Sequence, residues 1–211
     1  RYSASLLVAQ DQAMNIIRSL SLKELSEISK FKAPGFVFTP NDSFSSKISR
    51  INDHKVDDSQ IDAFCSPEAD DLTWPFPPNS LKMTITLTDF AKSMPEDPEV
   101  PRELQNKDKV KKYKEVYAKR GMRMISAHEY AMMQMRELPG KTTILDDHFT
   151  PDSGTLTLLN NDHLPPQEQD SKSLWGNSRG FTPGFCADAP GKVNYRARSR
   201  PSFPIMEVEV L

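Results

Sequence analysis

The chain has 211 residues, of which 37% are apolar and 17 are proline, and its formal net charge at pH 7 is −2. The small net charge excludes a strong overall field for nucleic acid or membrane surfaces, so any such contact would be local. The sequence has no run of 18 apolar residues, and we therefore expect no membrane-spanning helix. The low apolar fraction and the many prolines predict a modest core with much extended backbone.

The first segment, residues 1–32, predicts two amphipathic helices. In residues 4–20 the apolar side chains cover one half of the helical wheel. Ser21 and Glu24 have the spacing of a capping box, which predicts that a second, short helix begins there. Such helices cannot bury their apolar faces alone, so they pack on the chain's own core or on a partner. We expect partner contacts at Leu6, Ala13 and Ile17.

The second segment, residues 33–79, is acidic, rich in proline and mostly irregular. Residues 36–38 predict a short strand between Pro34 and Pro40. Near its end the prolines fix an extended backbone from which Trp74 and Phe76 project. These two aromatic side chains dock onto another protein surface or, alternatively, fold back on the chain's own core.

The third segment, residues 80–164, is the predicted core. Apolar residues and threonines alternate over 80–88, which predicts a strand with one buried face. Residues 101–120 and 126–138 predict a helix pair, with Gly121 as a left-handed cap and Ser126 and Glu129 as a second capping box. His128 falls on the apolar side of the second helix, where we expect a core residue. Residues 142–145 and 155–159 predict a hairpin.

The fourth segment, residues 165–211, lacks periodicity until a last strand over 205–211, and it predicts an extended tail. Residues 175–180 are interpreted as a flexible turn. The tail combines aromatic and basic side chains, which favours contact with other subunits. The predicted contacts are Phe181, Phe185, Tyr195, Arg196, Arg198 and Arg200.

Two other kinds of site are alternatives. All four histidines neighbour an acidic residue, and Asp147, His148 and His163 would suit zinc, manganese or non-haem iron. Basic clusters from Lys107 to Arg123 and from Lys192 to Arg200 would suit a phosphate backbone. However, the sequence has no nucleotide-binding loop, no H-E-x-x-H and no paired C-x-x-C, and it therefore predicts no cofactor and no catalytic residue. Cys65 and Cys186 are typical of free thiols in a reducing, intracellular compartment, with one long-range disulfide as the alternative.

Together these patterns predict an α+β fold. Its small core consists of two helix pairs, a strand and a hairpin, with long proline-rich segments around it. Chains of this kind gain stability by lying on other subunits. The first functional hypothesis is a non-catalytic structural or scaffolding subunit of a larger intracellular assembly. A metal-dependent enzyme and a nucleic-acid-associated factor are the alternatives.

Overall fold

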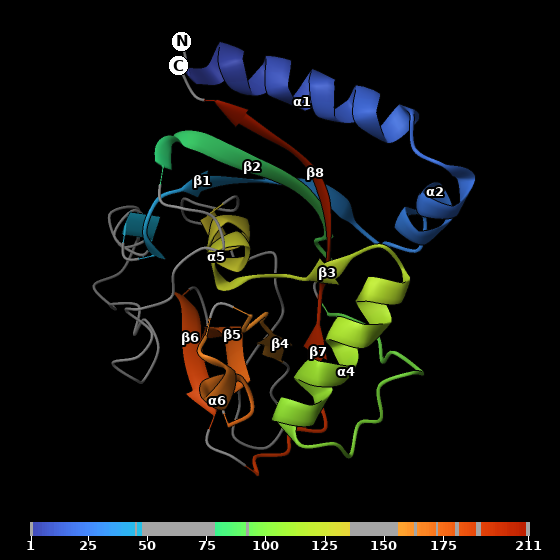
Figure 1. The fold of residues 1–211 in the computed structure, drawn as a ribbon, viewed down its shortest axis with the longest axis vertical. Helices are drawn as coiled ribbons and strands as arrows, with labels where there is room; N and C mark the ends of the chain where they lie inside the picture. Colours follow the sequence, from blue (N-terminus) through green and yellow to red (C-terminus); the bar gives the residue numbers. More distant parts are fainter. Residues whose placement is uncertain are drawn as a thin grey trace.

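The computed structural model confirms the α+β class and arranges its strands in two four-stranded sheets (Figure 1). The structure describes residues 2–44, 46–47, 79–91, 93–135, 156–162, 164–171, 173–179, 182–188 and 191–209. The predicted strand 142–145, Trp74 and Phe76 lie outside these residues.

The N-terminal helices are α1 (Tyr2–Arg18) and α2 (Leu22–Ile28). The predicted capping box is confirmed, because the Glu24 backbone N–H donates to Ser21 Oγ and the Ser21 backbone N–H donates to the Glu24 carboxylate. The face of α1 that carries Ala9 and Ala13 packs on this chain's own first sheet, around Ile85. The apolar face expected to bind a partner is therefore used largely inside the protein.

The first sheet has the order β1-β2-β8-β3, and every neighbouring pair in it is antiparallel. Its strands are β1 (Pro34–Asn41), β2 (Asn79–Asp89), β8 (Pro201–Glu209) and β3 (Arg123–Met124). The strand predicted over 36–38 is therefore part of a longer one. The register shifts between Pro40 and Asn41 of β1, and again between Ile85 and Thr86 of β2.

Helices α1 and α5 (Ala127–Met135) cover opposite faces of this sheet (Figure 1). The strand predicted over 80–88 is confirmed as β2, but both of its faces are buried, including Thr86 and Thr88. Burial of these two threonines is not costly, because their hydroxyl groups donate hydrogen bonds to buried acceptors. Thr86 donates to the buried Glu129 carboxylate at 3.5 Å, and Thr88 donates to the Pro201 carbonyl at 2.6 Å.

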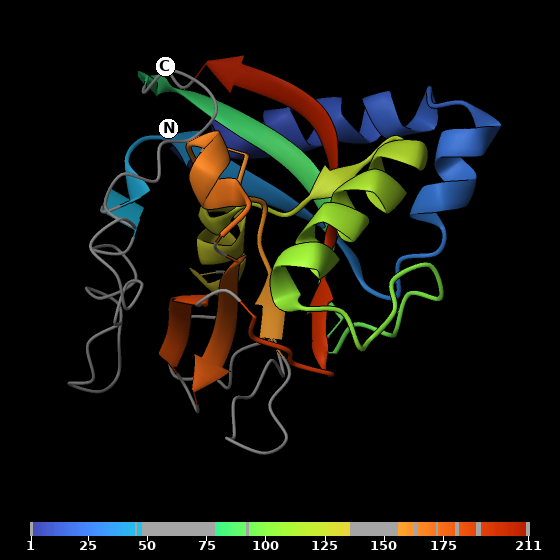
Figure 2. The ribbon, with the colours of Figure 1, turned by 60° about the horizontal axis from the view of Figure 1, so that its bottom comes forward.

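The second sheet has the order β6-β5-β4-β7 and lies beyond α5, with α4 (Asn106–Lys119) beside it (Figure 2). Its strands are β4 (Leu156–Leu158), β5 (Ser173–Arg179), β6 (Thr182–Asp188) and β7 (Ala197–Ser199), with the short α6 (Pro166–Gln169) between β4 and β5. Of the neighbouring pairs described in this sheet, β4 and β7 are parallel and the others are antiparallel. The predicted extended tail is therefore wrong, and the turn expected at 175–180 belongs largely to β5. Buried Leu174, Trp175 and Phe185 stabilise these strands.

The central helix pair is confirmed, with one change at its start. α4 begins at Asn106 and not at Pro101, where the chain instead makes a turn. Gly121 has a φ of 73°, and its N–H and that of Met122 donate to carbonyls in the last turn of α4, as expected for a left-handed cap. His128 is buried next to Phe44, with 5.4 Å between the ring centroids, which agrees with the predicted core position.

Arg200 joins the two sheets. It lies between β7 and β8, and its side chain is completely buried. Its Nη1 donates to the carbonyls of Asp89 and Ala91 at 2.9 and 2.5 Å, and its Nε donates to Thr157 Oγ1 at 3.3 Å. Asp89 ends β2 in the first sheet, and Thr157 lies in β4 of the second. The predicted partner contact at Arg200 is thus an internal contact between the sheets.

Replacing Gly176 by alanine should destabilise the protein, because an added Cβ would lie 2.5 Å from a ring carbon of Tyr130. Tyr130 is buried and packs edge-on against Phe185, so its ring has little room to move. We expect Gly176→Ala to lower the free energy of unfolding by about 1–3 kcal/mol, measured by urea denaturation. In a Tyr130→Ala background, Gly176→Ala should lower the free energy of unfolding by much less. An equal cost in both backgrounds would contradict this explanation.

Candidate functional site

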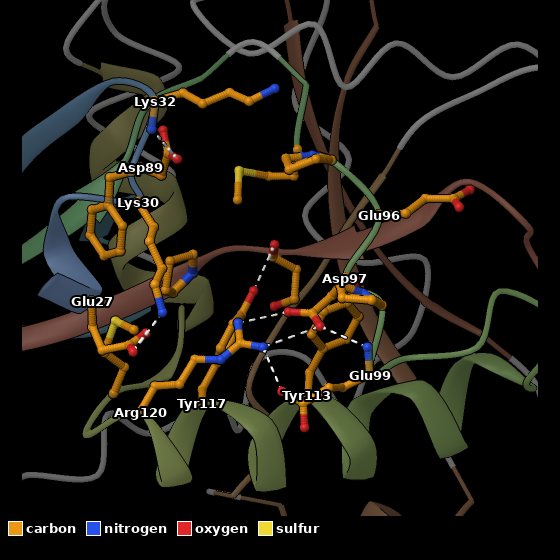
Figure 3. Close-up of a pocket in the computed structure, with 17 residues that line it drawn as sticks. Glu27, Lys30, Lys32, Asp89, Glu96, Asp97, Glu99, Tyr113, Tyr117 and Arg120 are labelled. Atoms are coloured by element: carbon orange, nitrogen blue, oxygen red, sulfur yellow. Dashed lines mark hydrogen bonds and ion pairs between the residues drawn. The ribbon is translucent and has the colours of Figure 1, made fainter.

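A pocket of about 510 Å³ lies where α2, α4, the end of β2 and the β7–β8 junction meet (Figure 3). One of its walls is residues 94–99, part of the acidic, proline-containing segment between β2 and α4. Residues from four distant parts of the sequence therefore face one space. This volume falls in the range of small-ligand sites, roughly 300–1,000 Å³.

The side of the pocket along α4 is formed by Tyr113 and Tyr117, whose ring centroids are 5.5 Å apart. The Tyr117 hydroxyl donates to the Ser199 carbonyl at 3.1 Å. Burial raises the pKa of Tyr113 to about 12 and raises the pKa of Tyr117 well above its ordinary value. Both phenols therefore stay protonated at neutral pH and offer aromatic surface and hydrogen bonds.

Arg120 fixes the wall made by residues 94–99. Its Nη1 and Nη2 donate to the two Asp97 carboxylate oxygens at 2.8 and 3.2 Å, and Nη2 also donates to Glu99 at 2.9 Å. Burial alone would lower the pKa of Arg120, but the hydrogen bonds to Asp97 and Glu99 outweigh it and raise that pKa. Together with the Arg198–Glu96 ion pair at 2.7 Å, these contacts tie the segment to the body of the protein.

Two more carboxylates line the opposite side. The Asp89 carboxylate accepts the backbone N–H groups of Lys32, Ala33 and Ala91 at 2.8–3.0 Å. Glu27 differs, because among the described residues its carboxylate has one partner, the Lys30 ammonium, which donates to Oε1 at 2.6 Å. Within the part of the chain that the structure describes, the buried Glu27 Oε2 has no hydrogen-bond partner.

The side chains of the pocket offer hydrogen bonds and aromatic surface. The tyrosines are neutral, and the charged side chains of Asp97, Glu99 and Arg120 are held in ion pairs. Among the described residues no group of three or more His, Cys, Asp and Glu side chains has the geometry of a metal site. Asp147, His148 and His163, the residues of the metal hypothesis, lie outside the described ranges.

The predicted partner contacts have different environments. Leu6 lies in α1, and Phe181 lies outside the described residues. The side chains of Ala13, Phe185 and Arg200 are buried inside this chain, and Ile17 is partly buried against its core. These four residues therefore pack within the protein. Tyr195 and Arg196 are exposed, and Arg198 forms its ion pair with Glu96.

The two predicted basic clusters lie side by side. The backbone N–H of Asn106 donates to the Lys192 carbonyl at 2.8 Å, and Lys109 Nζ donates to the Asn194 carbonyl at 2.5 Å. Much of the basic charge is compensated inside the described chain, since six of these residues pair with aspartate or glutamate. These six are Lys111, Lys112, Lys114, Arg120, Arg123 and Arg198.

Sequence reasoning did not identify the pocket or the exposed apolar residues Leu7 and Leu22. The interacting pairs are distant in sequence: Asp97 and Arg120 are 23 residues apart, and Lys32 and Asp89 are 57 apart. No local spacing connects them.

Comparison with known proteins gives no relative: the chain matches no protein-family model, no curated protein and no solved structure. Among the described helices, none is long and apolar enough to cross a membrane, as expected from the sequence.

The buried Lys109 should make stability depend on pH. Burial, with a smaller effect of the nearby Arg198, lowers the pKa of Lys109 from 10.5 to about 8. Between these values the unfolded chain holds a proton that the folded chain has released, so the contribution of Lys109 to stability rises with pH. Tyr113 acts in the opposite direction above pH 10, because its pKa rises from 10.0 to about 12 on folding.

We therefore expect the stability of the wild type, relative to a Lys109→Met variant, to rise from pH 8 to pH 10. Urea denaturation of both proteins across this range measures the difference, and effects of other groups cancel. Parallel pH profiles for the two proteins would show that Lys109 keeps its ordinary pKa.

The Arg120 ion pairs should contribute more to stability than an exposed pair on the same helix. Arg120→Gln leaves the mostly buried Asp97 without its cation, and we expect a loss of about 1–3 kcal/mol. Lys112→Gln is the matched control, because it breaks the exposed Lys112–Glu115 pair and should cost less than about 0.5 kcal/mol. Equal losses in urea denaturation would mean that residues 94–99 do not depend on Arg120.

Proposed function

We propose that this chain is a non-catalytic structural or scaffolding subunit of a larger intracellular assembly. In this proposal the outer side of the N-terminal helices contacts a neighbouring protein subunit. The single observation that supports it most is the exposure of several large apolar side chains on these two helices. Leu7 is 64% exposed, Val8 57% and Leu22 87%, and Met14 is also exposed.

These residues are distinct from those that hold the helices in place. Ala9 and Ala13 of α1 already pack on the first sheet. Leu7, Val8 and Leu22 therefore add little to the fold while leaving apolar surface in water, which association with another subunit would remove. Among the described residues the other large exposed apolar side chain is Tyr195, which lies next to Arg196 and supports a second, smaller contact.

The pairing of charged groups in the pocket also supports a binding role. Its ionisable side chains mainly stabilise the walls, and its two tyrosines are protonated at neutral pH. The chain has only two cysteines, far apart in the sequence, which favours free thiols in a reducing compartment.

The proposal predicts that in a native extract the chain migrates as part of a complex larger than one chain. Leu7→Asn combined with Leu22→Asn should weaken association at least about tenfold, because each buried leucine contributes roughly 1.5–3 kcal/mol. The measurement is native electrophoresis of the extract with detection of this chain. Gln10→Ala, an exposed polar position on α1, is the control and should leave the complex intact.

Both variants should melt at the wild-type temperature when purified, since the altered side chains are exposed in the fold. Migration of the wild-type chain at the mass of a single chain would overturn the proposal. So would a complex that tolerates both leucine substitutions.

A further inference from the structure

Glu27 has an incompletely satisfied carboxylate at the edge of the pocket. Its side chain is 17% exposed, and Oε1 accepts one hydrogen bond from Lys30 at 2.6 Å. Its Oε2 is buried, and no described residue donates a hydrogen bond to it. A buried carboxylate oxygen without a donor is costly, so this position favours a ligand that brings a second donor.

Lys30 is a replaceable partner for Glu27. Its side chain is 61% exposed, and it follows Glu27 by three residues at the end of α2. Exposed pairs of this kind contribute little to stability, so the lysine can turn into water at small cost. The present pair shows that a cation fits beside Glu27, but Lys30 is bonded to only one of the two oxygens.

We propose that this pocket binds a guanidinium group, with Glu27 as its anchor. A guanidinium presents two parallel N–H donors, which match both oxygens of a carboxylate, whereas an ammonium acts as a point charge. The opposite wall of the same pocket already contains such a pair, in which Arg120 donates to both oxygens of Asp97. Figure 3 shows the two carboxylates on different sides of the space.

The remaining lining also suits a cation. The charged residues that line the pocket are five acids, Glu27, Asp89, Glu96, Asp97 and Glu99, and three cations, Lys30, Lys32 and Arg120, so the lining is net negative. Phe31 and the two tyrosines supply aromatic rings, which attract a guanidinium through their π faces. Guanidinium binding here is independent of the role proposed for Leu7 and Leu22, which lie outside the pocket lining.

The guanidinium has two possible sources, a small free guanidine or an arginine side chain of a partner protein. The test is calorimetric titration of the purified chain with N-acetyl-L-arginine methylamide. The corresponding citrulline derivative is the neutral control of the same shape. Agmatine and a blocked pentapeptide with a central arginine then distinguish the sources. Similar affinities point to a free guanidine, and tighter binding of the peptide points to a partner's arginine.

We expect the arginine derivative to bind at least about tenfold more tightly than the citrulline derivative, as charge-assisted hydrogen bonds predict. Glu27→Gln should reduce its affinity by about the same factor. Lys30→Ala should increase the affinity, because it removes the competing cation. Lys23→Ala is the matched control on the same helix and should change nothing, since Lys23 is exposed and does not line the pocket.

The opposite effects of Glu27→Gln and Lys30→Ala separate recognition from damage to the fold, which would weaken binding in both variants. Absence of binding, or equal binding of the arginine and citrulline derivatives, would overturn the proposal. Unchanged affinity in Glu27→Gln would also overturn it. Weaker binding in a folded Lys30→Ala variant would also overturn the proposal, because it would show that Lys30 contributes to binding and does not compete with the ligand.

Discussion

The buried guanidinium of Arg200 is the interaction on which the arrangement of the two sheets depends. The chain passes directly from β7 in the second sheet to β8 in the first, and Arg200 lies at that crossing. Its donors reach the Asp89 and Ala91 carbonyls beside the first sheet and Thr157 in the second. A buried positive charge is tolerated only where polar groups surround it, so the ends of β2 and β4 must meet at this point.

The same junction positions the pocket. Asp89 presents its carbonyl to Arg200 and its carboxylate to the N–H groups of Lys32 and Ala33, directly after α2. Ser199 and Pro201, the neighbours of Arg200, line the pocket, and Tyr117 bonds to the Ser199 carbonyl. Residues 94–99 then complete the wall through Arg120. The buried guanidinium of Arg200 and the carboxylate of Asp89 therefore connect pocket walls that come from both halves of the sequence.

Local sequence signals predicted local structure well. The strand predicted from the alternation over 80–88, the capping box at Ser21 and the left-handed Gly121 each depend on neighbouring residues, and all three are confirmed. In the second sheet, the strand predicted over 155–159 is confirmed as β4, whereas β5, β6 and β7 were missed because they are short or interrupted by glycine and polar residues. Their stability comes from distant partners, as where Gly176 allows the Tyr130 ring to approach β5. The pocket could not be predicted either, because the partners of Arg120 and Asp89 are far from them in the sequence.

The prolines and register shifts of the first sheet restrict how copies of this protein can meet. Pro34 and Pro40 lie in β1, at one margin of the described sheet, and Pro204 lies in β8 opposite Thr86, where the register shifts. A proline has no N–H to offer, and an irregular register bends the strand, so neither strand is a good template for another chain's backbone. In the described part of the sheet these strands are therefore poor templates for edge-to-edge growth into fibrils.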